Sequence, residues 1–140
     1  MIPLSDRYSV SPQISAEDIP SIKSAGFSTI ICNRPDFEVP PDLQADTIRA
    51  AAEAAGLRFE VLPVTHQGMT PQTIARQMEL TEASDGPVLA YCNSGTRSSV
   101  VWALGQVGKM SVDDILTATR NAGYNLDGLK PTLMALSQRG

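Results

Sequence analysis

The feature that most constrains this chain is a short polar loop, residues 92–99, that joins two apolar runs. The run before it, Val-Leu-Ala-Tyr at 88–91, is short and follows a turn, so it predicts a buried strand. The run after it, Val-Val-Trp-Ala-Leu at 100–104, predicts a helix. The loop begins with Cys92, so this thiol would lie at the end of a strand and beneath the free N–H groups that open a helix.

This arrangement predicts an anion site that contains a nucleophile. Free amides and the positive end of a helix dipole bind anions, and the same field with a nearby arginine favours a thiolate. We therefore expect Cys92 to be the nucleophile and Arg97 to bind the substrate anion through both arms of its guanidinium group. The four residues between them are expected to supply backbone N–H donors: Asn93, Ser94, Gly95 and Thr96. Gly95 can also adopt the positive φ that a tight loop requires.

The length and charge of the chain exclude several classes of protein. Its 140 residues suffice for one domain, 1–140, with a normal core. The net charge of −4 and the scattered basic residues argue against nucleic-acid binding. No apolar run approaches the length of a membrane span, and the first residues lack a signal-peptide pattern, so we expect a cytoplasmic protein with no membrane contact. Two cysteines and one histidine do not form the usual four-ligand zinc site, so we expect no metal and no cofactor.

Strand and helix patterns alternate along the chain. Strands are expected at about 8–11, 27–32, 58–64 and 88–92, and helices at about 16–25, 43–55, 71–83, 98–106, 112–123 and 129–137. Such alternation predicts an α/β fold in three layers, with helices on both faces of a mainly parallel sheet of about four to five strands. Ligands bind beyond the carboxyl ends of parallel strands, where this chain would place three loops: 33–41, 65–69 and 93–97.

An ordered set of short segments accompanies the cysteine loop. They are Ser-Pro-Gln-Ile at 11–14, Gly-Phe at 26–27, Ile-Cys-Asn-Arg-Pro-Asp at 31–36, Gly-Leu-Arg at 56–58, Leu-Pro-Val at 62–64, Gly-Pro-Val at 86–88 and Cys-Asn-Ser-Gly-Thr-Arg-Ser at 92–98. In these segments the chain resembles the phosphatase-like domain that precedes the hydrolase domain in bacterial beta-lactamase-hydrolase-like proteins. The resemblance implies a fold similar to that of dual-specificity phosphatases, with the cysteine loop at the carboxyl edge of the sheet. It covers residues 10–104 and says little about the helical part, 110–140.

The chain departs from the phosphatase pattern in two respects. Protein tyrosine phosphatases place five residues between cysteine and arginine, whereas this chain has four and so resembles the short loop of rhodanese-type sulfurtransferases, whose cysteine carries a persulfide. Dual-specificity phosphatases also carry an acidic residue in the loop that corresponds to 65–69, where this chain reads Thr-His-Gln-Gly-Met, and usually a histidine where this chain has Tyr91. A general acid contributes about 10²–10⁴-fold to ester cleavage, but sulfur transfer with a good leaving group needs none. Both departures favour sulfur chemistry.

For two polar residues in or near the loop, the sequence allows more than one role. Ser98 could donate a hydrogen bond to the Cys92 sulfur, or it could serve only as a favourable residue early in a helix. His66, the single histidine, could replace the missing acid or bind the anion as an imidazolium. It could equally be an exposed loop residue.

The segment after the second expected strand supplies three further candidates. Arg34 could add positive charge to the pocket, and Asp36 could act as a distant acid or pair with Arg34 and hold the loop. Cys32 ends its strand as Cys92 does, so it could resolve an oxidised or persulfidated Cys92, although a packed core thiol explains it as well.

The leading functional hypothesis from the sequence is a sulfurtransferase. Sulfane sulfur would pass through a Cys92 persulfide to a thiol or cyanide acceptor with ping-pong kinetics. The resemblance implies a small anion or persulfide as substrate, a place in sulfide oxidation, and a persulfide-oxidising metalloenzyme as partner. The alternative is a cysteine-dependent phosphatase, acting on phosphotyrosine or a small phosphoester through a phosphocysteine. A third class is a non-catalytic sensor that binds phosphate or sulfate in the same loop.

Overall fold

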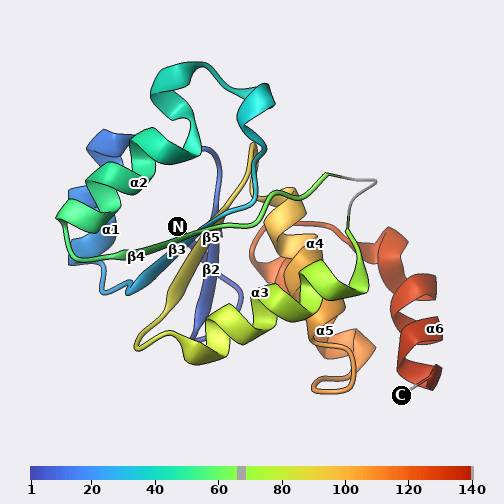
Figure 1. Ribbon diagram of the computed structural model, residues 1–140. Coiled ribbons are helices and arrows are strands. Elements are labelled where there is room, and N and C mark those ends of the chain that lie inside the picture. The colour runs from blue at the N-terminus through green and yellow to red at the C-terminus, as the bar shows by residue number, and fades with distance from the viewer. Residues whose placement is uncertain (66–68, 140) are drawn as a thin grey trace.

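The computed structural model describes residues 1–65 and 69–139, and within them the chain forms one five-stranded sheet (Figure 1). The strands are β1 (Ile2–Pro3), β2 (Tyr8–Ser11), β3 (Thr29–Cys32), β4 (Arg58–Val61) and β5 (Val88–Tyr91). Their spatial order is β1-β2-β5-β3-β4, and every pair is parallel except β1 with β2. This confirms the mainly parallel sheet. The sequence analysis missed β1, a two-residue edge strand whose Pro3 lacks the N–H that an interior strand needs.

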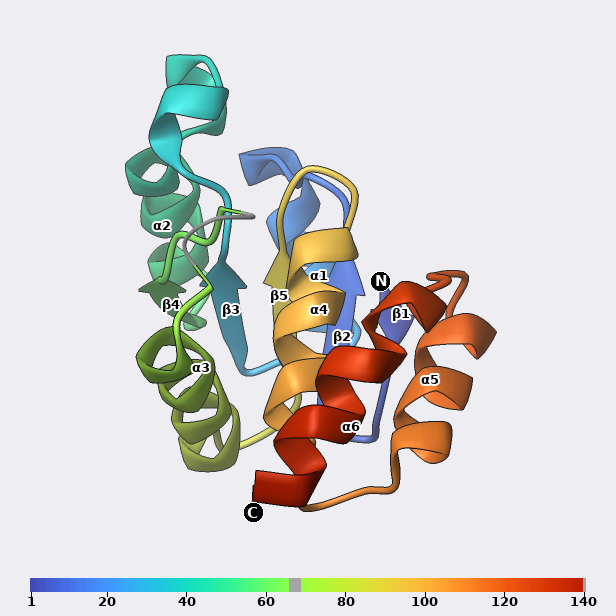
Figure 2. The ribbon, with the colours of Figure 1, turned by 90° about the vertical axis from the view of Figure 1, so that its right-hand side faces the viewer.

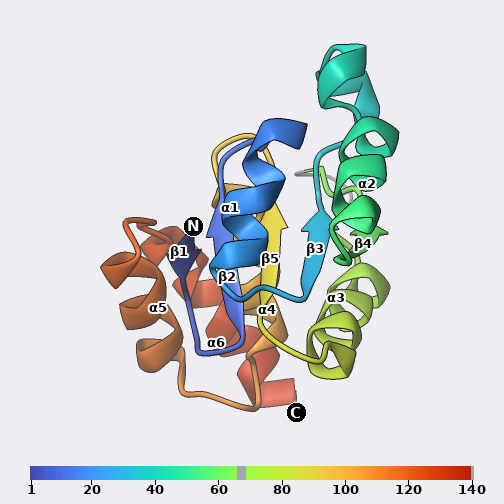
Figure 3. The ribbon, with the colours of Figure 1, turned by 90° about the vertical axis from the view of Figure 1, so that its left-hand side faces the viewer.

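The helices cover both faces of the sheet, as the alternating pattern predicts. They are α1 (Ile19–Ser24), α2 (Ala45–Ala54), α3 (Pro71–Ala83), α4 (Thr96–Gly105), α5 (Val112–Asn121) and α6 (Lys130–Arg139). Figure 2 shows α3, α4, α5 and α6 on one face, and Figure 3 shows α1 and α2 on the opposite one. Two helices begin with a side-chain cap, where Thr70 accepts from the Thr73 N–H and Ser111 accepts from the Asp114 N–H. The three-layer α/β/α fold is thereby confirmed.

The two layers of helices enclose two separate hydrophobic cores, and β5 contributes to both of them. Leu89 and Tyr91 pack toward α1 and α2, whereas Val88 and Ala90 pack toward α3 to α6. This alternation follows from the two-residue period of a strand. The carboxyl end of β5 is therefore held from both sides by buried side chains.

Three parallel strands end at one edge of the sheet. In the register of the ladder, Ser11 of β2 and Cys32 of β3 both lie beside Tyr91 of β5. The segments that follow these strands consequently meet at this edge, where the N–H of Gln13 donates to the Asn93 carbonyl over 3.0 Å. The segment after β3, drawn in cyan in Figure 1, rises above the edge and carries two short 3₁₀ turns, Asp36–Glu38 and Pro41–Leu43.

A buried polar network ties α3 and α4 to the sheet below this edge. The side-chain amides of Asn33 and Gln77 form a reciprocal pair, with N···O distances of 2.7 and 2.9 Å. Gln77 also donates to the Tyr8 hydroxyl, which in turn donates to the Ser98 carbonyl over 2.8 Å. Burial raises the pKa of Tyr8, so its hydroxyl stays protonated as this donor role requires. Because Asn33, Gln77 and Tyr8 are buried, the loss of one member leaves its partners with fewer hydrogen bonds and no water to replace them.

No helix in residues 1–65 and 69–139 combines the length and the apolarity needed to cross a membrane.

Replacing Gln77 with leucine tests this network. We expect the free energy of unfolding to fall by about 1–3 kcal/mol, because the Asn33 amide loses its reciprocal partner and stays buried. Urea-induced unfolding measures this, and Gln72→Leu at an exposed position of the same helix is the matched control. Equal unfolding free energies for the two variants would contradict the role given to the network.

Candidate active site

The cysteine loop joins β5 to α4 as the sequence predicts. Cys92 follows directly after β5 and is 1% exposed, and Gly95 is the N-cap of α4 with φ at +94°. The backbone N–H of Gly95 donates to Cys92 Sγ over 3.2 Å. The sulfur thus lies under the N-terminus of α4 and accepts a backbone amide hydrogen bond there.

The backbone N–H groups of the loop do not all point toward the anion site, contrary to the expectation from the sequence. The Gly95 N–H is directed to the sulfur, and the Thr96 N–H points to Ser94 Oγ over 3.4 Å. Ser94 Oγ donates in turn to Thr96 Oγ1 over 2.9 Å. Asn93, Ser94 and Thr96 nevertheless line a common cavity with Arg97, so they remain on its surface.

A tyrosine from the C-terminal part of the chain supports the loop from outside. Tyr124 follows α5, and its hydroxyl donates to the Ser94 carbonyl over 3.0 Å. It packs so closely on Gly95 that a Cβ at this position would overlap the hydroxyl. Burial raises the pKa of Tyr124, and the charge of Cys92 raises it further. The sequence analysis gave no role to this part of the chain, because only tertiary packing brings it to the loop.

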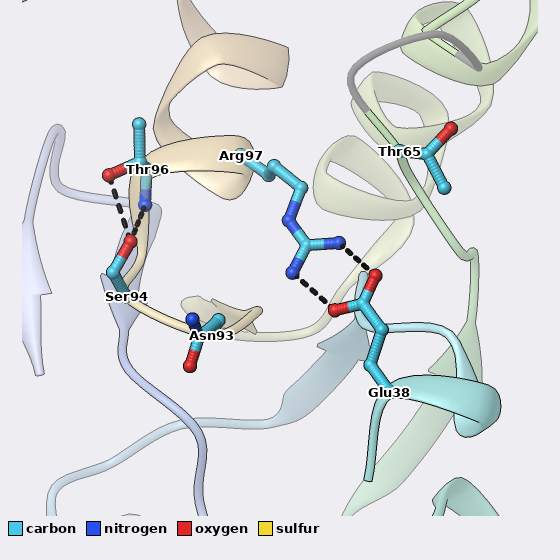
Figure 4. Close-up of a pocket in the computed structure, with 6 residues that line it drawn as sticks. All are labelled: Glu38, Thr65, Asn93, Ser94, Thr96 and Arg97. Atoms are coloured by element: carbon cyan, nitrogen blue, oxygen red, sulfur yellow. Dashed lines mark hydrogen bonds and ion pairs between the residues drawn. The ribbon is translucent and has the colours of Figure 1, made fainter.

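Arg97 lies beside Cys92, as predicted, but its guanidinium group already binds a carboxylate. Nη2 is 2.7 Å from Glu38 Oε1, and Nη1 is 2.9 Å from Glu38 Oε2 (Figure 4). Nη1 also donates to the Val64 carbonyl over 3.0 Å. The paired Glu38 raises the pKa of Arg97, and Cys92 acts in the same direction. Arg97 is 8% exposed and the Glu38 side chain is 25% exposed, so this ion pair is partly buried.

The carboxylate of Glu38 is shared between two arginines. Arg34 Nε is 3.2 Å from Glu38 Oε1, and Arg34 Nη1 donates to Gln13 Oε1 over 3.2 Å. The hydrogen bonds from Arg97 hold the pKa of the Glu38 carboxyl group below its usual range, and Arg34 acts in the same direction. Arg34 therefore lies beside the Arg97–Glu38 pair, but it does not line the cavity, and its role in anion binding stays a prediction. Glu38 was not among the residues predicted for the site, because residues 34–38 form no α-helix in which an i,i+4 pair could be expected.

Asp36 has a different partner from the one the sequence suggested. Its Oδ1 accepts the backbone N–H of Ala45 over 2.9 Å, so it satisfies a free amide at the start of α2. The hypothetical pair between Asp36 and Arg34 is wrong, because Arg34 turns to Glu38 instead. Asp36 does not line the cavity beside the loop, which also removes the support for its role as a distant acid.

The predicted hydrogen bond from Ser98 to the Cys92 sulfur is also corrected. Ser98 is fully buried, and its hydroxyl donates to Asn33 Oδ1 over 2.9 Å. A hydroxyl carries one proton, so this bond leaves none for the sulfur. Ser98 belongs to the buried network that fixes the first turn of α4.

Cys32 and Cys92 end neighbouring strands but face different sides of the sheet. Cys32 lies beside Tyr91 in the ladder and packs in the core under α1 and α2, whereas Cys92 is one residue further along. The Cys32 thiol donates to the Arg34 carbonyl over 3.3 Å, and burial raises its pKa. This opposite orientation argues against direct exchange between the two thiols. Both are free in the described part of the chain. His66, the remaining candidate, lies outside the described residues.

The residues around Arg97 form a cavity of about 370 Å³ (Figure 4). Its described lining consists of Glu38, Thr65, Asn93, Ser94, Thr96 and Arg97. Within residues 1–65 and 69–139, no group of three or more His, Cys, Asp or Glu side chains is placed to hold a metal ion. The cavity offers an arginine, a carboxylate and the polar loop residues, and the Cys92 thiol lies buried beside Arg97.

Comparison with known proteins places the chain near cysteine phosphatases. Residues 2–109 match the model of the phosphatase-like domain of beta-lactamase hydrolase-like proteins. A beta-lactamase hydrolase-like protein from Agrobacterium fabrum is 33% identical over 126 residues, which are 88% of this chain and 29% of that protein. One from Xylella fastidiosa strain Temecula1 is 30% identical over 128 residues, which are 90% of this chain and 30% of that protein. The chain thus spans less than a third of these curated relatives.

Solved structures agree with this placement. A proposed phosphatase from Neisseria meningitidis has a TM-score of 0.86 and 33% identity, with 96% of each chain covered. The kinase-associated phosphatase has a TM-score of 0.72 at 15% identity, covering 94% of this chain and 85% of that chain, which shows the shared fold alone. The cysteine-phosphatase-like fold inferred from the sequence is therefore confirmed.

A glycine series tests the packing of the loop. We expect Gly95→Ala to lower the free energy of unfolding by at least about 1–3 kcal/mol, because alanine is strained at φ +94° and also overlaps Tyr124. Gly108→Ala, with φ at +88° and open space around it, isolates the backbone strain. Gly128→Ala, with neither strain nor contact, is the neutral control. Thermal and urea unfolding rank the variants, and a Gly95→Ala cost no larger than that of Gly108→Ala would contradict the Tyr124 contact.

Proposed function

The chain belongs to the phosphatase-like domain family of beta-lactamase hydrolase-like proteins, and we propose that it is a cysteine-dependent phosphatase that forms a phosphocysteine at Cys92. The observation that carries this proposal is the convergence at the N-terminus of α4. Cys92 Sγ, held by the Gly95 N–H, lies buried beside the Arg97 guanidinium group, and Arg97 in turn lines the cavity. A thiol nucleophile, the positive end of a helix dipole and an arginine that can bind two oxygens together suit attack on a phosphate ester.

The reaction follows from these positions in two displacements. The phosphoryl oxygens bind Arg97 and the loop, and Cys92 Sγ attacks phosphorus. The S–P bond forms while the ester P–O bond breaks, and its electron pair leaves on the ester oxygen. Water then attacks phosphorus, the S–P bond breaks, and the thiolate returns as inorganic phosphate leaves. The small polar cavity, about 370 Å³, suits a phosphoryl group with a modest leaving group.

Sulfur transfer remains the second candidate because of two specific observations. The loop holds four residues between Cys92 and Arg97, and the charge of Arg97 is already balanced by Glu38. A sulfane donor such as thiosulfate needs neither a large anion cradle nor a general acid. Cys92 would attack the outer sulfur of thiosulfate, sulfite would leave with the electron pair of the S–S bond, and cyanide or a thiol would take the sulfur. A persulfide-oxidising metalloenzyme is the partner expected in this case.

A side-by-side assay of wild type and Cys92→Ser separates the candidates. We expect wild type to release phosphate from an aryl phosphate, and Cys92→Ser to lose about 10³-fold or more of this rate because the nucleophile is gone. The same samples are tested with thiosulfate plus cyanide and with glutathione persulfide. Thiocyanate formation and a one-sulfur mass increase on Cys92, without phosphate release, would replace the phosphatase proposal with sulfur transfer. Phosphate binding without either activity would favour the sensor class.

A further inference from the structure

The Glu38 carboxylate occupies the edge of Arg97 that a substrate oxyanion would use. Its two oxygens meet Nη1 and Nη2 in the parallel arrangement that guanidinium groups also form with phosphate. Together with the bond to the Val64 carbonyl, three of the five N–H donors of this guanidinium group are engaged. The Nε–H and the outer Nη2–H stay available on the neighbouring edge, so only a phosphoryl group that takes the Nη1–Nη2 edge displaces Glu38, and a catalytic role for Glu38 requires that binding mode.

Glu38 is the acid placed to act once it is displaced. Of the described residues that line the cavity, it alone carries a carboxyl group, and its side chain is 25% exposed there. Asp36 is held at the start of α2, and the loop 65–69 contains no carboxylate in its sequence. The charged groups that face Glu38 are Arg97 of α4, with Cys92 behind it, and Arg34 after β3, while Thr65 is neutral.

Resting on the proposed phosphatase function, we propose that Glu38 is the proton donor of the reaction: the phosphoryl group displaces it from Arg97, and its carboxyl group then protonates the leaving oxygen. The role is catalytic because the group contacts the substrate, and it accounts for the lack of an acid in the loop where dual-specificity phosphatases carry theirs.

The substrate itself can supply the proton. A phosphate monoester loses its second proton near pH 6, so its monoanion can pass that proton to Glu38 and bind Arg97 as the dianion. Loss of the arginine contacts and the approach of a dianion both raise the pKa of the carboxyl group, which favours this transfer. As Cys92 Sγ bonds to phosphorus, the ester oxygen leaves with its electron pair and takes the proton from Glu38. The Glu38 carboxylate next accepts a proton from the attacking water, and phosphate departs after the S–P bond breaks.

We expect the substitution Glu38→Gln to have opposite effects on phosphate binding and on the rate of hydrolysis. In a Cys92→Ser background, we expect inorganic phosphate to bind roughly 10-fold more tightly after the change, because the competing carboxylate is gone. In the active enzyme, hydrolysis of an alkyl phosphate should fall by about 10²–10⁴-fold, while hydrolysis of para-nitrophenyl phosphate, whose leaving group needs little protonation, should fall by less than about 10-fold. Calorimetry measures the binding and phosphate release measures the rates.

The pH profile and two further variants complete the test. Wild-type kcat/KM should decrease above about pH 6, where the substrate loses the proton it delivers, and Glu38→Gln should lack this decrease. Glu38→Asp, which keeps a carboxyl group, should restore part of the alkyl phosphate rate. Glu60→Gln is the matched control, since Glu60 pairs with Arg58 over 2.9 Å on β4 and does not line the cavity.

The outcomes separate this inference from the function on which it rests. Weaker phosphate binding by Glu38→Gln, or an equal loss of rate for both esters, would mean that Glu38 only orients Arg97, and would overturn the proton-donor role. Wild-type protein that hydrolyses neither ester would overturn the phosphatase function and the proton-donor role with it. Tighter phosphate binding together with a selective loss on the alkyl ester supports both steps of the proposal.

Discussion

The parallel register that sets Cys32 of β3 beside Tyr91 of β5 decides what surrounds Cys92. Parallel neighbours end at the same edge, so the segment after β3 must emerge next to the cysteine loop. That segment carries Arg34 and Glu38, which meet Arg97 there. A shift of one residue in this register would exchange the two faces of the strand and separate these charges from the thiol.

The charges at the site are arranged around one carboxylate. Glu38 binds Arg97 through both oxygens and Arg34 through one of them, so two cations share a single anion beside the thiol. A partly buried pair of this kind contributes little net stability, yet removal of one member leaves an uncompensated charge. In the proposed mechanism the same carboxylate controls the access of substrate to Arg97. A substrate dianion offers Arg97 the same geometry with more charge, which makes the exchange chemically reasonable.

The loop itself is held from two directions. Below it, the buried amides of Asn33 and Gln77 fix the first turn of α4 through Ser98. Above it, Tyr124 bonds to the Ser94 carbonyl and fills the space beside Gly95. Both supports come from segments far from the loop in the chain, and both restrict it to one geometry. A site of this kind gains its precision from such packing rather than from the loop sequence alone.

Local sequence patterns predicted the alternation of strands and helices, the parallel sheet, and the thiol-arginine loop at a helix N-terminus. These features depend on local periodicity and on glycine and capping chemistry, which neighbouring residues encode. Which side chains meet at this loop depends instead on long-range packing. Ser98 turns to Asn33 rather than to the sulfur, and Asp36 caps α2. Glu38 reaches Arg97 across 59 positions of the chain. Such pairings depend on the direction in which each side chain leaves its helix or strand, and on packing between distant segments. Neither can be predicted from a pattern of neighbouring residues.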